Sequence, residues 1–254
     1  MMRMAGMAAV AMAGVWLATP AAAQTVDEVV ARHVEARGGE QKLKAIETLK
    51  ITRTIGTPFT RVDVVVYRKR PNLVRTEQKA AGQTATTVSG INKDAVWDPA
   101  AGGKVVLRPE ALAAMAREVD GDFDGDLLVD WKAKGHAVTL EGREAVGGVD
   151  TWKLRVTTAS GAVREIYLDA NTSLDYQHVG SMMLPGKRTR EFTITFGNWK
   201  EVEGVKFAFD ADEERREGPI NQSLATYTHT IEINVPMDDT LFSTPAGAAP
   251  AGGQ

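Results

Sequence analysis

The sequence contains no cysteine among its 254 residues, and this absence limits both how the protein is stabilised and what chemistry it performs. Without disulfides, stability has to come from an apolar core of adequate size. Catalysis by a thiolate is excluded, and so is anchoring through a lipid-modified cysteine. We therefore expect a protein that is not acyl-anchored and that folds around a substantial core.

The sequence also lacks a surplus of one charge and the common catalytic motifs. Its formal net charge is −3, so there is no basic excess of the kind that binds nucleic acid. The patterns G-x-S-x-G, G-x-G-x-x-G and H-E-x-x-H and the phosphate-binding P-loop are missing, and no two histidines have the spacing of metal ligands. We therefore predict no enzymatic activity, no catalytic residue, no metal, no cofactor and no nucleic-acid partner.

A long apolar run lies at the N-terminus. Arg3 is its single charge, Met4 to Leu17 are small or apolar, and Ala21 to Ala23 form an A-x-A cleavage site. Glycines and a proline interrupt the run, which argues against an uncleaved membrane span of about 20 apolar residues. We predict a signal peptide over residues 1–23, cleaved after Ala23, and export to the periplasm.

Much of the remaining chain alternates between apolar and polar residues. In residues 151–157 every second side chain is apolar, and Ser160-Gly161 provides a turn. Similar alternation, bounded by turn residues, recurs in residues 60–68 and 225–235. Such period-2 patterns predict antiparallel strands with one buried face. With about ten strands, we predict a mainly β fold with helices (α+β), built on a single curved antiparallel sheet.

Two segments have helical rather than strand periodicity. Residues 25–38 place their apolar side chains on one stripe, begin with capping-box spacing, and end at two glycines. Residues 109–134 begin with a proline and contain two short apolar-faced patterns, the second formed by Leu127, Leu128 and Trp131. This helical insert is the natural lid over the apolar face of the sheet.

Several polar or flexible features allow two interpretations each. The acidic run 120–126 resembles the start of a calcium loop, but an apolar residue stands where the bidentate glutamate belongs, so we favour helix capping. His33, His136 and His229 fall on apolar faces, as core histidines do and as polar groups inside a ligand cavity would. The two methionines at 182–183 form either an exposed loop at the mouth of the fold or a packed strand end.

The order of the elements over about residues 25–245 resembles that of a known family. The most specific pieces are the helix that ends before residues 43–46, the segment 124–130, the strand pair 152–156 and 167–169, and the ending 234–239. In these pieces the chain resembles the periplasmic outer-membrane lipoprotein-sorting (LolA-like) family. The resemblance implies an open half-barrel with helices covering its concave face, and acyl chains held in the apolar space between them. It implies one domain over residues 24–245, and the Ala/Gly/Pro-rich residues 246–254 are predicted to be a disordered tail.

Together, these observations predict a periplasmic, non-enzymatic carrier that holds the acyl chain of a lipoprotein or another lipid in an apolar cavity. Shielding an acyl chain from water is worth about 0.8 kcal/mol per methylene. The expected partners are the lipid and membrane-bound donor and acceptor proteins, and we expect a monomer. The candidate ligand-binding residues are the large members of the apolar faces: Trp97, Leu127, Leu128, Trp131, Trp152, Phe192, Phe207 and Phe209.

Two alternatives would use the same fold. An envelope sensor or interaction module would use the cavity for detection and would need a fixed protein partner. A hydrolase with an unrecognised carboxylate site would place two buried carboxylates in one cleft.

Overall fold

The computed structural model describes residues 24–57, 59–100, 104–112, 126–184 and 188–250, so the predicted signal peptide lies outside the described residues. The helices are α1 (Val26–Arg37) and α2 (Glu40–Lys44), with short 3-10 helices η2 (Pro109–Ala111) and η4 (Asp239–Phe242). The strands are β1 (Thr48–Gly56), β2 (Arg61–Lys69), β3 (Leu73–Ala80), β4 (Thr87–Ile91), β5 (Val96–Pro99), β6 (Val105–Leu107), β7 (Ala137–Val146), β8 (Val149–Thr157), β9 (Val163–Asp169), β10 (Asp175–Leu184), β11 (Arg188–Val202), β12 (Val205–Glu217), β13 (Ile220–Ile233) and β14 (Ala249–Pro250).

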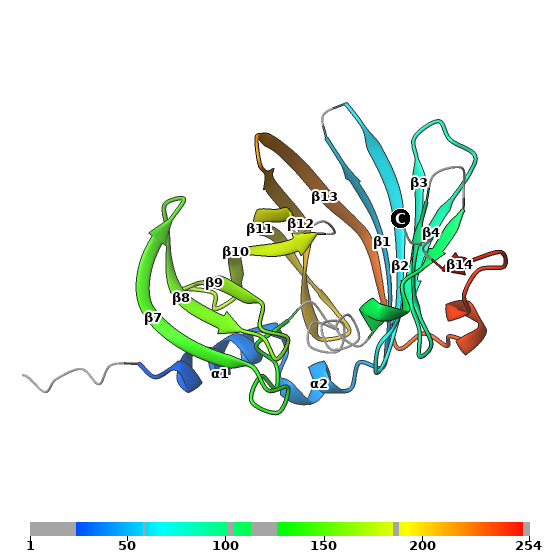
Figure 1. The fold of residues 1–254 in the computed structure, drawn as a ribbon. Coiled ribbons are helices and arrows are strands. Elements are labelled where there is room, and N and C mark those ends of the chain that lie inside the picture. Colours follow the sequence, from blue (N-terminus) through cyan, green and yellow to red (C-terminus); the bar gives the residue numbers. More distant parts are fainter. Residues whose placement is uncertain (1–23, 58, 101–103, 113–125, 185–187, 251–254) are drawn as a thin grey trace, which may run out of the picture.

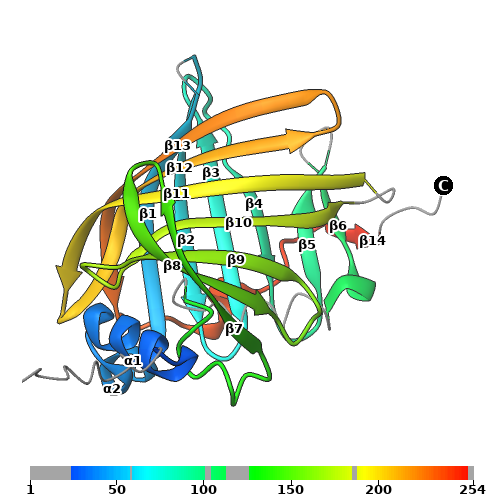
Figure 2. The same ribbon diagram turned by 90° about the vertical axis from the view of Figure 1, so that its left-hand side faces the viewer.

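All these strands belong to one sheet, which consists of two antiparallel meanders. Strands β1 to β6 follow one another on one side and β7 to β13 on the other, and β13 pairs with β1 where the meanders meet. Strand β14 pairs with β6 in parallel at one edge, and β7 forms the opposite edge. The sheet is open and strongly curved (Figure 1 and Figure 2). The predicted mainly β fold with one large curved sheet is confirmed.

The alternating apolar side chains of the central strands gather on one face of the sheet. Ile51 of β1 lies opposite both Val66 of β2 and Ile231 of β13, and residues directly opposite one another share a face. The buried residues form two clusters. The first joins the α2 region to the middle of the sheet: Leu43, Ile46, Leu49, Val129, Val205, Phe207, Phe209, Ile231 and Ile233. The second joins α1 to β7–β9: Val29, Val30, Leu127, Leu128, Val138, Leu154, Val156, Ile166 and Leu168.

Helices α1 and α2 lie across one end of the curved sheet (Figure 1 and Figure 2), and α1 begins and ends as its sequence predicts. The backbone N–H of Glu28 donates to the Thr25 hydroxyl (3.3 Å), and the backbone N–H of Thr25 donates to the Glu28 carboxylate (2.8 Å), which completes a capping box. The helix ends at Gly38, whose φ of 129° disfavours any other residue. A side chain at Gly38 would also collide with the carbonyl of Gly204. Among the described residues, no helix is long and apolar enough to cross a membrane.

The described parts of the predicted helical insert are helical only at its start. Residues 109–111 form η2 and Leu112 is α-helical, whereas residues 127–135 form bends and turns. The side chains of residues 127–129 are all buried, so the supposed helical stripe is in fact three consecutive buried residues of an irregular segment. Residues 113–125 lie outside the described residues, and a helical lid there stays a prediction.

Two further expectations are wrong. Residues 249–250 of the predicted disordered tail pair with β6 as β14. His229 is exposed rather than part of the core, because the β1–β13 register shifts between Thr52 and Arg53 and such an irregularity changes which side chains face the core. His229 Nε2 instead lies 2.8 Å from the hydroxyl oxygen of Thr54.

The two methionines of the β10–β11 hairpin are exposed. Met182 keeps 43% and Met183 76% of its surface accessible. Of the two interpretations of this segment, a packed strand end is therefore wrong, although both residues do belong to β10.

Candidate ligand-binding site

A pocket of ≈200 Å³ is lined by residues of α1, of β1 and β2, and of β10 to β13. We call it the interior pocket. Its large apolar lining residues are Leu49, Ile51, Val66, Phe196, Trp199, Phe207 and Ile231. Its charged and hydroxyl lining residues are Arg37, Arg53, Arg68, Asp175, Asp210, Thr226 and Thr228. The pocket is therefore a largely apolar space with a few charged groups in its wall.

Beside this pocket lies a group of buried polar side chains, which we call the buried cluster: His33, Arg37, Asp126, Asp175 and His178. His33 Nε2 lies 2.9 Å from Asp126 Oδ2 and 3.8 Å from Asp175 Oδ2. Arg37 Nη1 lies 2.9 Å and 3.9 Å from the same two oxygens. His178 Nε2 lies 2.8 Å from Asp175 Oδ1. The cluster thus ties α1 to the segment that begins at Asp126 and to the start of β10.

The contacts of His33 fix its protonation. Its Nδ1 lies 2.8 Å from the carbonyl oxygen of Ser173, which can only accept, and its Nε2 faces the Asp126 carboxylate. Both ring nitrogens therefore donate, and the ring is an imidazolium. Burial alone would lower the pKa of His33, but attraction to Asp126 and Asp175 and the hydrogen bond to Asp126 outweigh it and raise the pKa to about 9.

The pKa values of the two carboxylates in the buried cluster are lowered, whereas that of His33 is raised. Burial alone would raise the pKa of Asp126, but the charges of His33 and Arg37 and the hydrogen bond from His33 hold it well below its usual range. For Asp175, burial is likewise outweighed by the charge of His33 and the hydrogen bond from His178, so its pKa is lowered. The imidazolium of His33 and the guanidinium of Arg37 therefore balance the two carboxylate charges away from water.

Arg37 and Asp126 also organise the backbone around the buried cluster. Arg37 Nε donates to the carbonyl of Lys206 (2.7 Å), and its guanidinium lies 5.5 Å from the ring centroid of Trp199 and 5.7 Å from that of Phe207. Asp126 Oδ1 accepts a hydrogen bond from the backbone N–H of Leu128 (2.8 Å). The predicted helix capping is therefore wrong for this aspartate, because the segment that follows it is irregular and not a helix. Residues 120–125 of the acidic run lie outside the described residues.

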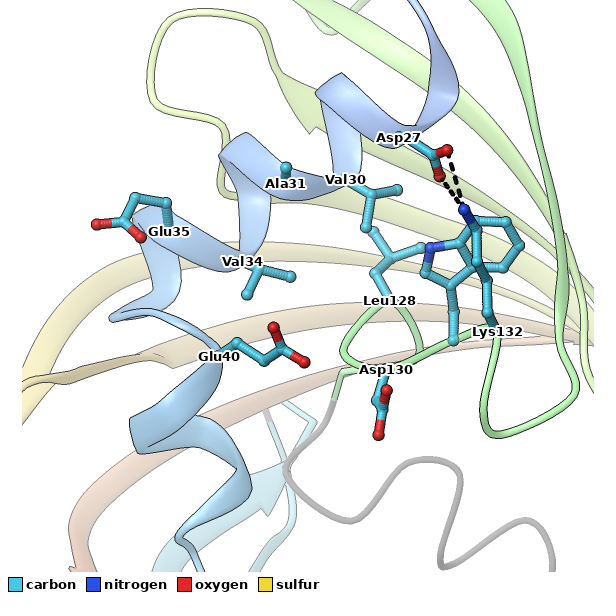
Figure 3. Close-up of a pocket in the computed structure, with 10 residues that line it drawn as sticks. Asp27, Val30, Ala31, Val34, Glu35, Glu40, Leu128, Asp130 and Lys132 are labelled. Carbon is cyan, nitrogen blue, oxygen red and sulfur yellow. Dashed lines mark hydrogen bonds and ion pairs between the residues drawn. The ribbon is translucent and has the colours of Figure 1, made fainter.

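A second pocket, of ≈360 Å³, lies between α1 and residues 128–132 (Figure 3). Val30, Val34 and Leu128 form its apolar floor, and its other lining residues are Asp27, Ala31, Glu35, Glu40, Asp130, Trp131 and Lys132. Part of this acidic lining is neutralised, since Lys132 Nζ lies 2.7 Å from Asp27 Oδ1 and Lys44 bridges Glu40 and Asp130. The second pocket is a groove with an acidic rim and does not join the interior pocket through any shared lining residue.

The predicted ligand-binding residues are divided among several places. Phe207 lines the interior pocket, and Phe209 belongs to the same apolar cluster. Leu128 and Trp131 line the second pocket instead. Because Leu127 is buried against α1 with Leu128, these residues also have an ordinary core role.

The three remaining predicted residues are aromatic and line neither pocket. Trp152 packs beside the α1 cluster, with Arg32 and Arg143 over its ring. Trp97 is fully buried against Gly90. Phe192 covers Gly180 on the neighbouring strand, where a larger residue would collide with the ring.

Sequence reasoning missed the charged members of the interior pocket. Arg53 follows Leu49 and Ile51 at alternate positions of β1, and Arg68 follows Val66 in the same way in β2. A charged residue at an apolar position of a strand is unusual in a core, and this break in the pattern is the signal that identifies both arginines. Within the described residues, no group of three or more metal-ligating side chains could hold a metal ion.

No protein-family model and no curated protein matches the sequence, but the fold matches solved structures. A LolA superfamily protein from Nitrosomonas europaea aligns with a TM-score of 0.55 at 11% identity, over 87% of this chain and 99% of the other. A DUF1329 family protein from Desulfovibrio piger aligns with a TM-score of 0.54 at 12% identity, over 87% and 98%. An outer membrane lipoprotein-sorting protein domain from Vibrio parahaemolyticus aligns with a TM-score of 0.50 at 11% identity, over 85% and 94%. The protein therefore has a LolA-like fold, as the resemblance in its sequence predicted.

Proposed function

We propose that the protein is a periplasmic carrier that binds a lipid by its acyl chain on the concave side of the half-barrel. The observation that carries the proposal is the interior pocket, because a largely apolar cavity with a few polar groups is the usual form of a small-ligand site. Its volume of ≈200 Å³ is below the about 300–1,000 Å³ of pockets that enclose drug-sized ligands. As it stands it accommodates part of an acyl chain, so a whole chain requires the cover of the concave side to open.

The fold supports the same role. One similar solved structure is described as an outer membrane lipoprotein-sorting domain, and the predicted signal peptide would deliver this chain to the same compartment. We propose that α1 and the predicted lid cover the concave side, and that membrane-bound proteins donate and accept the lipid. A lid that must open should be less tightly packed than the sheet it covers.

We also propose that the protein is not an enzyme. Asp126 and Asp175 are two buried carboxylates close to one another, which is the arrangement that a hydrolase would need. A general acid needs a raised pKa, whereas attraction to His33 outweighs burial and lowers the pKa of both. Both acids are also held by cations, which supports a role in the fold.

A matched pair of variants in β2 tests the carrier function. Val66 lines the interior pocket, and its neighbour Val65 points to the opposite face. Val66→Trp should fill the pocket and weaken the binding of a fluorescent fatty-acid probe at least tenfold. Val65→Trp adds the same side chain outside and should leave binding unchanged, and circular dichroism shows whether both variants keep the sheet.

Two results would contradict the carrier function. Normal probe binding by Val66→Trp would show that the acyl chain does not bind in the interior pocket. Failure of the unaltered protein to bind the probe, together with native mass spectra of periplasmic protein that show no lipid, would remove the carrier function altogether.

A further inference from the structure

Two arginines enter the interior pocket from neighbouring strands, Arg53 from β1 and Arg68 from β2. In the register of the two strands they are separated by the pair Ile51–Val66 and lie on the same face of the sheet. Their long side chains bring the two charges close enough to act on one another. Two positively charged side chains therefore lie next to the apolar residues Ile51 and Val66 in the wall of the pocket.

Arg53 has no counter-ion within the described part of the chain. Its Nε is buried and makes no hydrogen bond with any described residue, and no described carboxylate lies within ion-pair distance of it. Burial and the charge of Arg68 lower the pKa of Arg53, and attraction to the more distant Glu213 opposes this only in part. Arg53 is half-buried, and a charge drawn away from water without a partner is unfavourable. No described residue supplies the anion that would neutralise it.

The acidic side chains around the interior pocket are engaged elsewhere or placed at a distance. Glu213 is held by Arg215 through two hydrogen bonds of 2.6 Å. Asp175 belongs to the buried cluster and faces His33 and His178. Asp210 lines the pocket but makes no ion pair with Arg53. The positive charge of Arg53 is therefore available to a ligand.

We infer that the interior pocket binds an anionic amphiphile, whose carboxylate or phosphate lies against Arg53 and Arg68 while its acyl chain follows the apolar wall. This inference rests on the proposed carrier function and narrows the ligand of that same site. A guanidinium is planar and presents paired N–H donors that match either anion. A carboxylate is the smaller group, and the ≈200 Å³ of the pocket favours it, so a single-chain fatty acid is the ligand class that fits best.

Binding of oleate and of oleyl alcohol separates the charged group from the chain, because the two ligands share the chain and differ in the anion. The unaltered protein should bind oleate at least about tenfold more tightly, since a hydrogen bond to a charged group contributes about 1.5–3 kcal/mol. Arg53→Met and Arg68→Met should each reduce this preference and leave affinity for oleyl alcohol unchanged or higher. Arg61→Met is the matched control, because Arg61 is exposed on the other face of β2.

The outcomes distinguish this inference from the carrier function. Equal affinity for oleate and oleyl alcohol would contradict the inferred anion site and would leave the proposed carrier function intact. Failure of both ligands to bind would contradict the carrier function itself. Displacement of oleate by inorganic phosphate alone would show a site for a free anion and would overturn the amphiphile. An unchanged preference in a folded Arg53→Met protein would overturn the assignment to Arg53, and Arg68→Met gives an independent measurement should the first variant not fold.

Discussion

The buried cluster contains a buried arginine and the wall of the interior pocket contains half-buried ones, and the two places differ in how the arginine charge is neutralised. In the buried cluster, Arg37 and His33 share the carboxylates of Asp126 and Asp175 at distances from 2.9 Å to 3.9 Å. In the pocket, Arg53 has a buried Nε and no partner among the described residues. Desolvation of a charge is compensated only where a close partner and hydrogen bonds replace water. The buried cluster meets this condition, and Arg53 does not meet it with any residue that the structure describes.

This difference separates residues that serve the fold from residues that serve a ligand. Loss of any member of the buried cluster leaves the others with unbalanced buried charge and should destabilise the protein. Loss of Arg53 removes an unbalanced charge, so it should stabilise the protein without ligand and weaken the binding of an anion. Opposite signs of the two effects are the sharpest test of the comparison.

The largest effect is expected for Asp126→Asn. The asparagine keeps the size of the side chain but leaves Arg37 and His33 with Asp175 as their remaining carboxylate, and breaking a buried pair in this way costs about 3–5 kcal/mol. Urea denaturation followed by circular dichroism measures the change in the free energy of unfolding. A loss below about 1 kcal/mol would contradict the view that the cluster holds α1 to the sheet.

The next effect is a loss of stability in alkaline solution. The pKa of His33 is raised from 6.5 to about 9, so the folded protein holds a proton that the unfolded chain releases. The contribution of this charge is fully present below pH 6.5 and is lost as the pH rises through about 9, with a slope of up to about 1.4 kcal/mol per pH unit. Urea denaturation at a series of pH values measures the slope.

A variant without the imidazole separates His33 from other groups that titrate in alkaline solution. His33→Gln should be less stable near neutral pH and should show a flatter profile between pH 6.5 and 9. A profile of the same slope in both proteins would assign the pH dependence to another group.

Much of the sheet was predictable because half-buried antiparallel strands show their period directly in the sequence. Residues 151–157 alternate regularly and form β8, with Leu154 and Val156 buried. Strands β5 and β6 were not predicted, since they have four and three residues and are too short to show the alternation. The same limit explains the wrong helix at residues 127–129, where three consecutive buried side chains fit no single period.

The charge relations of the site were not predictable, because they join residues far apart in the chain. His33 and Asp126 are 93 positions apart, and nothing local distinguishes Asp126 from the other aspartates of its acidic run. Arg53 and Arg68 do break the apolar pattern of their strands, so the sequence does indicate that both lie on the apolar face of the sheet. That Arg53 has no partner among the described residues is seen only in the structure.

A gain in stability is expected for Arg53→Met. The methionine occupies similar space without charge. When no ligand is present, the free energy of unfolding of the variant should therefore be about 1 kcal/mol higher than that of the unaltered protein. Oleate should then raise the melting temperature of the unaltered protein more than that of the variant. A less stable variant would indicate that Arg53 already has a favourable partner, and it would erase the contrast with the buried cluster.

The smallest effect is expected for Lys50→Met, three residues before Arg53 in the same strand. Lys50 Nζ lies 2.7 Å from Glu232 Oε1 of β13, but both side chains are well exposed to water, where screening and side-chain entropy leave an ion pair with little net stability. The denaturation midpoint should therefore shift less than in any of the buried variants, although the Lys50–Glu232 ion pair is shorter than the ion pairs of Arg37. A loss as large as that of Asp126→Asn would show that distance, and not burial, sets the strength of these pairs. The distinction between a balanced buried cluster and an unbalanced pocket would then lose its physical basis.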